Sequence, residues 1–385
     1  MPTFALMALR FPAKLLKEID KCRRRFLWGQ DQELSGGGAK ISWERVCSPI
    51  EHGGLGILDL KKFSRALRLR WLWHTWKSPE RPWAGTEPPC DASDHALFSA
   101  VTKVEVGNGQ LASFWHSAWI DATPLKVLHP ILFKLSRRKN RSVAQALNDD
   151  RWIIDLAHGD ANAIAPEVLN LHRRLHPRRL ALQEASRDDT TWQMTASGRY
   201  SVRSAYAAQF QGRVESRLRT VIWDTWAPSK LKIFAWLLHQ DRLWCNDRLQ
   251  RRGWINSYFC QLCLRNLESS EHLFWQCRFA ATVWTLISTW HGCEAMHQGT
   301  WTDKQSSVDR VQAMVEASPP IFRKGAKALA MLVLWEIWKE RNSCVFREKV
   351  ANVEDVISAI RRGLCLWQQG GAKIILSPFG DTTGE

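Results

Sequence analysis

Residues 260–277 read CQLCLRNLESSEHLFWQC, and this stretch fixes the local fold around it. Its thiols and imidazole follow the spacing C-x2-C-x8-H-x4-C, which falls on Cys260, Cys263, His272 and Cys277. A C-x2-C pair lets two thiolates reach one ion from a single tight turn, and a His and a Cys about one helical turn apart close the other side. Because zinc prefers four sulfur and nitrogen donors in a tetrahedron, the spacing predicts a zinc site.

The predicted site leaves no coordination position for water. A catalytic zinc keeps one position open, whereas here four side chains fill all of them, so we predict a structural Zn²⁺. The alternative interpretation is a set of buried free thiols beside an incidental histidine. Four nearby residues with less regular spacing are possible substitute ligands: His239, Cys245, His291 and Cys293.

Length and charge narrow the class of protein. The chain has 385 residues, enough for two or three domains, and 54 Lys and Arg against 38 Asp and Glu give a net charge of +16. This balance predicts acidic partners, nucleic acid first, although a solvated basic surface is the alternative. The longest apolar run, Ala328–Trp335, is too short for a membrane span, and Arg10 interrupts any secretory signal. We therefore expect a nuclear or cytoplasmic protein with reduced thiols and no membrane partner.

Basic and aromatic residues alternate around the cysteines. Basic groups neutralise phosphates and aromatic rings stack on unpaired bases, so these residues are candidates for contacts with RNA or DNA. Tryptophans at helical spacing usually belong to a core, and we expect most of the 22 to be buried. The candidate basic residues are Lys230, Lys232, Arg242, Arg248, Arg252 and Arg265.

The patterns predict an α+β fold that is mainly α-helical. A helix is expected from 59 to 77 with Asp59 as its N-cap, and two further helices near the C-terminus. Two small β-hairpins are predicted, one in 104–120 turning at Gly107-Asn108-Gly109 and one in 192–202 turning at Ser197-Gly198. A small zinc-stapled module completes the expected fold.

Residues 199–284 resemble the zinc-binding domain that follows the reverse transcriptase of plant non-LTR (LINE-type) retrotransposons. The resemblance begins at Tyr200-Ser201-Val202, continues through Trp223, Pro228 and Trp236, and ends with the Cys/His set and Trp284. Segments outside this region are similar to other parts of the same elements: Phe26-Leu27-Trp28-Gly29, Gly53-Gly54-Leu55-Gly56, Gly107-Asn108-Gly109 with Phe114-Trp115, and Trp338-Lys339-Glu340-Arg341-Asn342.

The resemblance implies four parts. Residues 1–77 would be a remnant following a polymerase domain, and 78–189 a linker and small hairpin-containing region. Residues 190–295 would be the zinc-binding domain, and 296–385 a helical region that would precede RNase H. The chain is therefore expected to be a truncated retroelement product without the polymerase domain.

A polymerase needs an aromatic-x-Asp-Asp turn. Neither Asp149-Asp150 nor Asp188-Asp189 fits, so both pairs are interpreted as surface loop carboxylates and no catalytic residue is assigned. We expect a zinc-binding accessory region of a retrotransposon reverse transcriptase that binds nucleic acid and is not itself an enzyme. The alternatives are a structural or protein-interaction zinc module, which contacts other domains of a retroelement polyprotein, and a non-functional remnant.

Overall fold

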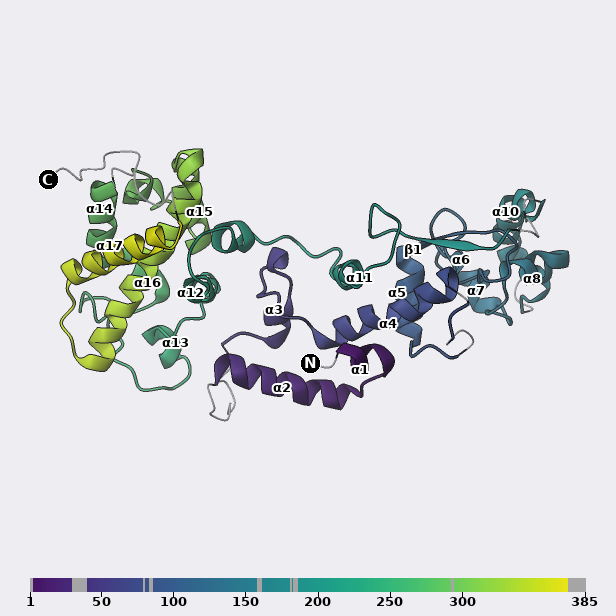
Figure 1. Cartoon of the computed structure of the whole chain (residues 1–385), viewed down its shortest axis with the longest axis horizontal. Coiled ribbons are helices and arrows are strands. Elements are labelled where there is room, and N and C mark those ends of the chain that lie inside the picture. The colour runs from purple at the N-terminus through teal and green to yellow at the C-terminus, as the bar shows by residue number, and fades with distance from the viewer. Residues whose placement is uncertain are drawn as a thin grey trace. The chain divides into compact units, whose positions relative to one another are not determined.

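The structure is a computed structural model that describes residues 3–29, 40–78, 80–82, 86–157, 161–180, 182, 186–291 and 294–372. The chain forms two compact units (Figure 1). Unit 1 comprises residues 1–23 and 58–213, and unit 2 comprises residues 24–57 and 214–385. The boundary passes through helix α2 (Ala13–Trp28). The four-part division implied by the resemblance stays a prediction.

Unit 1 consists of helices around one small sheet. Its long helix begins after Asp59, whose carboxylate accepts a hydrogen bond from the Lys62 N–H at 3.0 Å, so the predicted N-cap is confirmed. A 3-10 turn at Asn148–Asp150 leads into α9. The helices are α1 (Thr3–Ala8), α4 (Leu60–Lys77), α5 (Ala92–Val101), α6 (Leu125–Leu128), α7 (Pro130–Leu135), α8 (Val143–Leu147), α9 (Arg151–Ile154), α10 (Ala161–Leu180) and α11 (Val202–Ala208).

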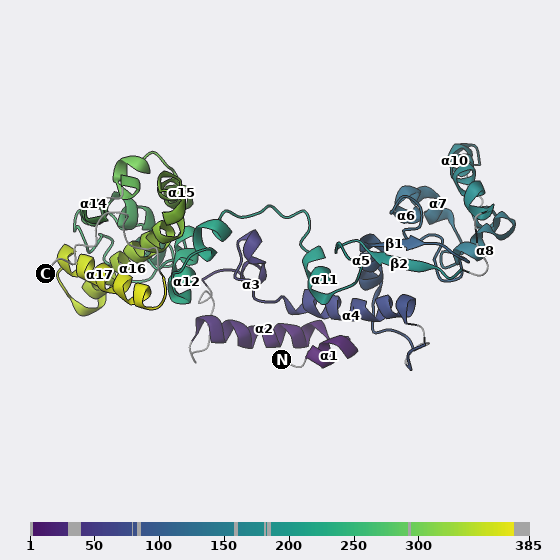
Figure 2. The same cartoon turned by 45° about the horizontal axis from the view of Figure 1, so that its top comes forward.

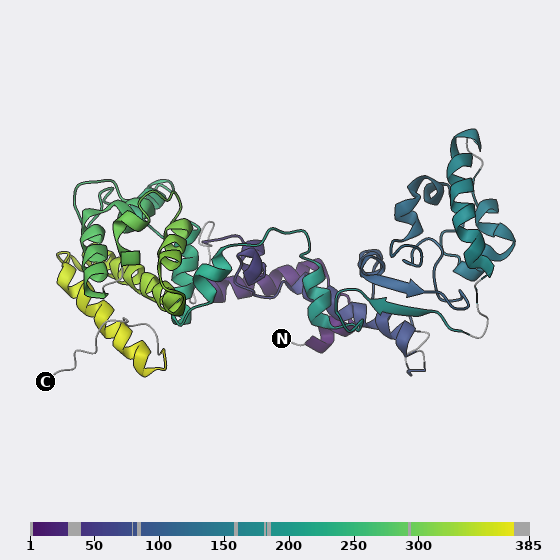
Figure 3. The ribbon, with the colours of Figure 1, turned by 90° about the horizontal axis from the view of Figure 1, so that it is seen from above.

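The two predicted hairpins are wrong. Strand β1 (Thr102–Glu105) instead pairs antiparallel with strand β2 (Asp189–Trp192), in the register Thr102↔Trp192 to Glu105↔Asp189 (Figures 2 and 3). Neither 106–120 nor 193–202, all of which the structure describes, supplies a returning strand. The turn at Gly198 closes with one ladder-like bond, from the Trp192 N–H to the Gly198 carbonyl, before Ser201 caps α11.

Asp188 explains why the first hairpin does not form. Its side chain is buried and accepts four backbone N–H bonds from the glycine loop, from Gly107 and Gly109 at one oxygen and from Leu111 and Ala112 at the other, all at 2.7–2.9 Å. These amides are therefore not available to a strand ladder. At Gly107 a Cβ would lie 2.3 Å from the Ser186 carbonyl oxygen, so the approach of the two segments requires glycine.

Unit 1 has two apolar clusters, both built around tryptophan. In the first, Trp73, Trp192 and Tyr200 stack or meet edge to face between α4, β2 and the start of α11. In the second, Phe114 lies against Trp115 and Trp152 among helices α6–α10. Aromatic pairs of this kind dominate core energetics, and they account for part of the unusual tryptophan content.

Unit 2 is helical, and two of its short turns are π-helical, at Arg219–Trp223 and His272–Gln276. It also contains 3-10 turns at Ile50–His52, Glu294–Met296, Gln298–Thr300 and Pro320–Phe322. Its helices are α3 (Trp43–Cys47), α12 (Ser229–His239), α13 (Asn246–Gln250), α14 (Arg278–His291), α15 (Ser307–Ala317), α16 (Arg323–Arg347) and α17 (Val353–Gln369).

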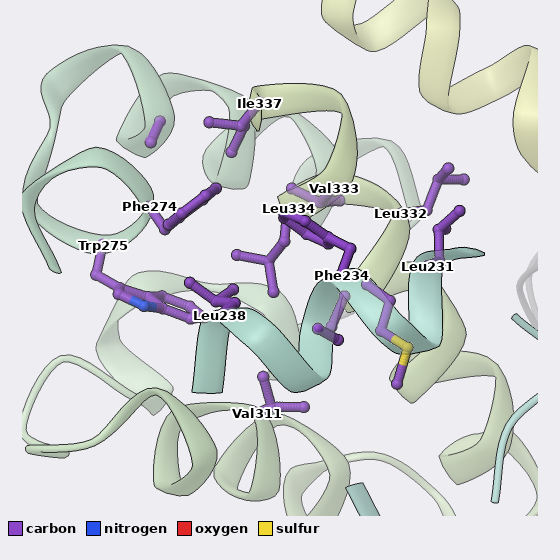
Figure 4. Packing of buried hydrophobic residues seen from close by; sticks show 14 of the residues in the cluster. Leu231, Phe234, Leu238, Phe274, Trp275, Val311, Leu332, Val333, Leu334 and Ile337 are labelled. Carbon is purple, nitrogen blue, oxygen red and sulfur yellow. The ribbon is translucent and has the colours of Figure 1, made fainter. Parts of the chain in front are cut away.

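Helix α16 forms the centre of unit 2. Its residues from Gly325 to Ile337 are buried with one partly exposed exception, Trp335, because α12, α15 and α17 pack on different sides of it. Figure 4 shows Phe234 and Leu238 of α12 facing Val333 and Leu334 of α16. Within this stretch the run Ala328–Trp335 is apolar on all sides, and such a helical segment is stable only when enclosed in this way.

Over the residues that the structure describes, the fold is mainly α-helical with one two-stranded sheet, so the predicted α+β class is confirmed. None of the helices in the described part of the chain combines the length and the apolar composition needed to span a bilayer.

Candidate metal centre

The four predicted ligands meet at one point in unit 2. Their donor atoms all lie within 4.8 Å of one another, and the four residues are buried. The sulfurs of Cys260 and Cys277 are 3.9 Å apart, and the Cys263 sulfur lies 3.4 Å from Nε2 of His272. A zinc tetrahedron with Zn–S near 2.3 Å and Zn–N near 2.0 Å has edges of about 3.8 and 3.6 Å. The cluster therefore has the chemistry and the size to hold a metal ion.

The C-x2-C side of the cluster is a short hairpin-like turn. The Cys260 N–H donates to the Asn266 carbonyl at 2.9 Å, and the Leu264 N–H donates to the Cys260 carbonyl at 2.8 Å. Leu264 takes a φ of 55°, which reverses the chain directly after Cys263. The turn holds both sulfurs on its inner side.

The His-x4-Cys side is a π-helical turn. The Cys277 N–H donates to the His272 carbonyl at 2.7 Å, a bond that spans five residues. In a π turn, two side chains five positions apart lie on the same side, just as side chains four positions apart do in an α-helix. Ser269 accepts the His272 N–H at 3.0 Å, and α14 begins directly after Cys277.

The pKa values of the donors reflect their mutual contacts. Hydrogen bonding with Cys277 and burial raise the pKa of Cys260 to about 12, and the same contact lowers the pKa of Cys277. Burial acts to raise the pKa of Cys263, but the N–H groups of Asn266 and Arg265 lower it below its ordinary value. Contact with Cys260 raises the pKa of His272. N–H groups directed at sulfur stabilise the thiolate, which is the form that binds metal.

A buried ion pair joins the C-x2-C turn to helix α16. Arg341 donates to both carboxylate oxygens of Glu268, at 2.5–3.1 Å, and to the Asn246 side chain at 3.0 Å. The side chains of Arg341 and Glu268 are only 3% and 0% exposed. Glu268 also accepts the Asn246 N–H at 3.0 Å. A fully satisfied network of this kind fixes the turn against the core.

We expect Arg341→Lys to loosen this turn. An ammonium cannot reproduce the two parallel bonds of a guanidinium, so the exchange is expected to cost about 2 kcal/mol. That corresponds to roughly 30-fold faster amide exchange in residues 258–272, measured by hydrogen exchange with mass spectrometry. The matched control is Arg347→Lys on the same helix, whose side chain is exposed and which should leave exchange unchanged. Equal exchange in both variants would contradict the role given to the pair.

The predicted basic residues do not form one group. Arg242, Arg248 and Arg252 lie together with Lys40, Arg45 and Arg251 around one hollow. Lys230 instead lies over the Trp335 ring at 5.1 Å, and Lys232 donates to the Trp223 carbonyl at 3.3 Å. Arg265 is exposed on the C-x2-C turn.

Sequence reasoning missed Lys40 and Arg45 as members of this group, and it did not keep Arg251 among the candidate residues. Lys40 and Arg45 lie about 200 positions before the others, and no local pattern links the two segments. The run Arg251-Arg252 was a visible signal for Arg251.

The substitute ligands and the aspartate pairs have other environments. Cys245 is buried and precedes α13, and burial raises its pKa well above its ordinary value. His239 carries a pKa lowered to about 4 by burial, while Cys293 lies outside the described residues. The interpretation of Asp188 as a surface carboxylate is wrong, because four backbone amides enclose it. Its neighbour Asp189 is exposed and pairs with Lys77.

Residues 200–284 match the family model described as zinc-binding in reverse transcriptase. The matched segment contains the whole Cys/His cluster and all six predicted basic residues. The resemblance to the reverse-transcriptase zinc-binding domain is thus confirmed for this segment, and the four clustered donors within it are able to hold a metal ion.

A relative in Arabidopsis thaliana, a putative ribonuclease H protein, is 24% identical over 316 residues. The alignment covers 74% of this chain, and the chain spans about half, 50%, of the length of that relative. No solved structure matches the chain.

Proposed function

We propose that this chain is a zinc-stabilised accessory region related to retroelement reverse transcriptases, and that it binds nucleic acid without catalysing a reaction itself. Cys260, Cys263, His272 and Cys277 hold the Zn²⁺ in this proposal. The observation that carries it is the convergence of all four donors, within 4.8 Å, inside the segment that matches the zinc-binding family.

The donor set supports a structural role for the metal. When three thiolates and one imidazole occupy a zinc tetrahedron, no position is left to activate water. The ion instead ties the C-x2-C turn to the π-helical turn, so that binding the metal contributes to the folding free energy.

The charge distribution supports nucleic acid as the partner. The excess of 16 positive charges is a property of the whole chain, but three of the six candidate residues gather in one basic hollow beside α13. Phosphate backbones are the commonest polyanions that such a surface meets in the nucleus or the cytoplasm. The resemblance to LINE-type elements and the ribonuclease H name of the plant relative agree with this class of partner.

A salt titration tests the proposal. Each phosphate contact with a single strand contributes about −0.7 to the slope of log affinity against log salt. With three or four contacts, the affinity of the full chain for a labelled oligonucleotide should fall roughly 20- to 50-fold between about 50 and 200 mM salt. Fluorescence anisotropy measures the affinity at each concentration.

Two alternative functions give different results in the same experiment. A structural or protein-interaction zinc module, and equally a non-functional remnant, would show no binding at low salt or an affinity that does not change with salt. Either result would overturn the nucleic-acid part of the proposal while leaving the zinc site standing.

A further inference from the structure

A hollow of about 780 Å³ in unit 2 is lined by six basic side chains, and its other lining residues are uncharged. One wall comes from residues 40–45 and the other from residues 240–252. The volume suits a nucleotide-sized group. The basic residues of this arginine hollow are Lys40, Arg45, Arg242, Arg248, Arg251 and Arg252.

Two arginines of the arginine hollow are held in place by backbone carbonyls, and Arg251 is paired with the carboxylates of Asp247 at 2.5 Å and Asp241 at 3.8 Å. Arg248 is buried and donates to the carbonyls of Arg242 and Lys40, while Arg45 donates to the His52 carbonyl at 3.2 Å. Burial and the neighbouring Arg242 and Arg252 lower the pKa of Arg248. Burial and Arg248 likewise lower the pKa of Lys40. Like charges that repel one another in a fixed concavity favour a bound anion.

An aromatic pair stands beside these arginines. The rings of Trp244 and Trp254 are 5.0 Å apart, and Trp254 is 48% exposed. The Arg252 guanidinium lies 5.1 Å from the Trp244 ring and 6.0 Å from the Trp254 ring. The arginines that line the hollow therefore also contact the indoles.

Local sequence explains why Trp254 projects at this place. Helix α13 is followed by Gly253 in the left-handed conformation, with a φ of +68°. The Gly253 N–H donates to the Gln250 carbonyl and the Trp254 N–H to the Leu249 carbonyl, the paired bonds of a Schellman motif. The motif folds Trp254 back beside the helix that carries Arg248.

We propose that the arginine hollow and Trp254 together bind single-stranded nucleic acid, RNA or DNA, with backbone phosphates in the hollow and a base against the Trp254 indole. This inference rests on the proposed function, and it adds where the nucleic acid binds and that it is single-stranded. Stacking on an indole requires an unpaired base, which a duplex does not offer. Guanidinium groups fixed beside the indole add contacts to the same nucleotide.

The test compares matched variants of the full chain in binding to labelled single strands of roughly 20 nucleotides, as RNA and as DNA, and to a duplex. Arg242→Gln/Arg252→Gln removes two charges at the hollow, and Arg347→Gln/Arg362→Gln removes two exposed charges elsewhere in unit 2. Trp254→Ala is compared with Trp290→Ala, which truncates an exposed indole on α14. Every variant is first shown to retain the zinc content and circular dichroism of the parent.

The hollow variant should bind single strands about tenfold or more weakly than its control, with a salt slope smaller by about 1.4. Trp254→Ala should lose roughly 5- to 100-fold on single strands and nothing on duplex, and Trp290→Ala should match the parent. Arg242→Lys/Arg252→Lys should restore most of the affinity because the charge is kept.

The outcomes separate this inference from the proposed function. If the parent binds but the hollow variant and its control are equally affected, the site is wrong and the function stands. Equal losses of duplex and single-strand binding in Trp254→Ala would refute the stacking assignment. A parent that binds none of the probes at low salt would overturn both.

Discussion

Replacing Cys260 and Cys277 by alanine is expected to unfold the core of unit 2. The two sulfurs lie 3.9 Å apart and belong to different turns, so their loss removes the connection between the C-x2-C turn and the start of α14. Structural zinc sites contribute about 10–16 kcal/mol of binding free energy in small peptides. That is comparable with the whole stability of a typical domain, about 5–15 kcal/mol.

The same core supplies a matched control. Cys245 and Cys344 are also buried in unit 2, and neither is among the four clustered donors. Changing both to alanine removes the same atoms and should cost only about 1–2 kcal/mol in all. Amide hydrogen exchange in residues 231–238 and 329–337 measures whether the core of unit 2 is still folded. Full protection of these segments in the Cys260→Ala/Cys277→Ala variant would refute the stabilising role of the metal.

Replacing Asp188 by alanine is expected to destabilise unit 1 by about 6 kcal/mol or more. The change leaves four backbone N–H groups of the glycine loop without their acceptor, and bonds to a charged group contribute about 1.5–3 kcal/mol each. Asp188→Asn keeps the shape but turns an NH2 group toward two of the donors, so it should cost about 3 kcal/mol. The expected result is a graded loss of amide protection in 102–119, largest for alanine.

The neighbouring aspartate provides the control for this prediction. Asp189 is one position away, but its carboxylate is 56% exposed and pairs with Lys77 at the surface. Surface ion pairs contribute about 0–1 kcal/mol, so Asp189→Asn should leave protection in 102–119 nearly unchanged. Similar effects of the two substitutions would show that the amide contacts of Asp188 are not what holds the loop.

The convergence of Cys260, Cys263, His272 and Cys277 could be predicted from sequence because it depends on local geometry. All four lie within 18 consecutive residues, and two short turns suffice to bring them together. The helices were predictable for the same reason, since caps such as Asp59 and the periodic apolar residues act within a few turns. The helices near the C-terminus were predicted, but the enclosure of α16 on several sides was not.

The sheet and the basic hollow could not be predicted because they join distant segments. Strand β1 pairs with a strand more than 80 positions later. The first glycine turn, which predicted a local hairpin, instead donates its amides to Asp188, and the second leads into the N-cap of α11. The hollow needs Lys40 and Arg45 beside Arg248. No periodicity or motif spacing encodes such a meeting, which depends on how the whole unit packs.

The most direct test of the central claim is to count zinc in the full chain, purified without chelator, by native mass spectrometry. We expect about one zinc per chain in the parent and in the Cys245→Ala/Cys344→Ala control, and none in Cys260→Ala/Cys277→Ala. A folded parent that carries no zinc, or a Cys260→Ala/Cys277→Ala variant that keeps it, would contradict the claim that these residues form the metal centre.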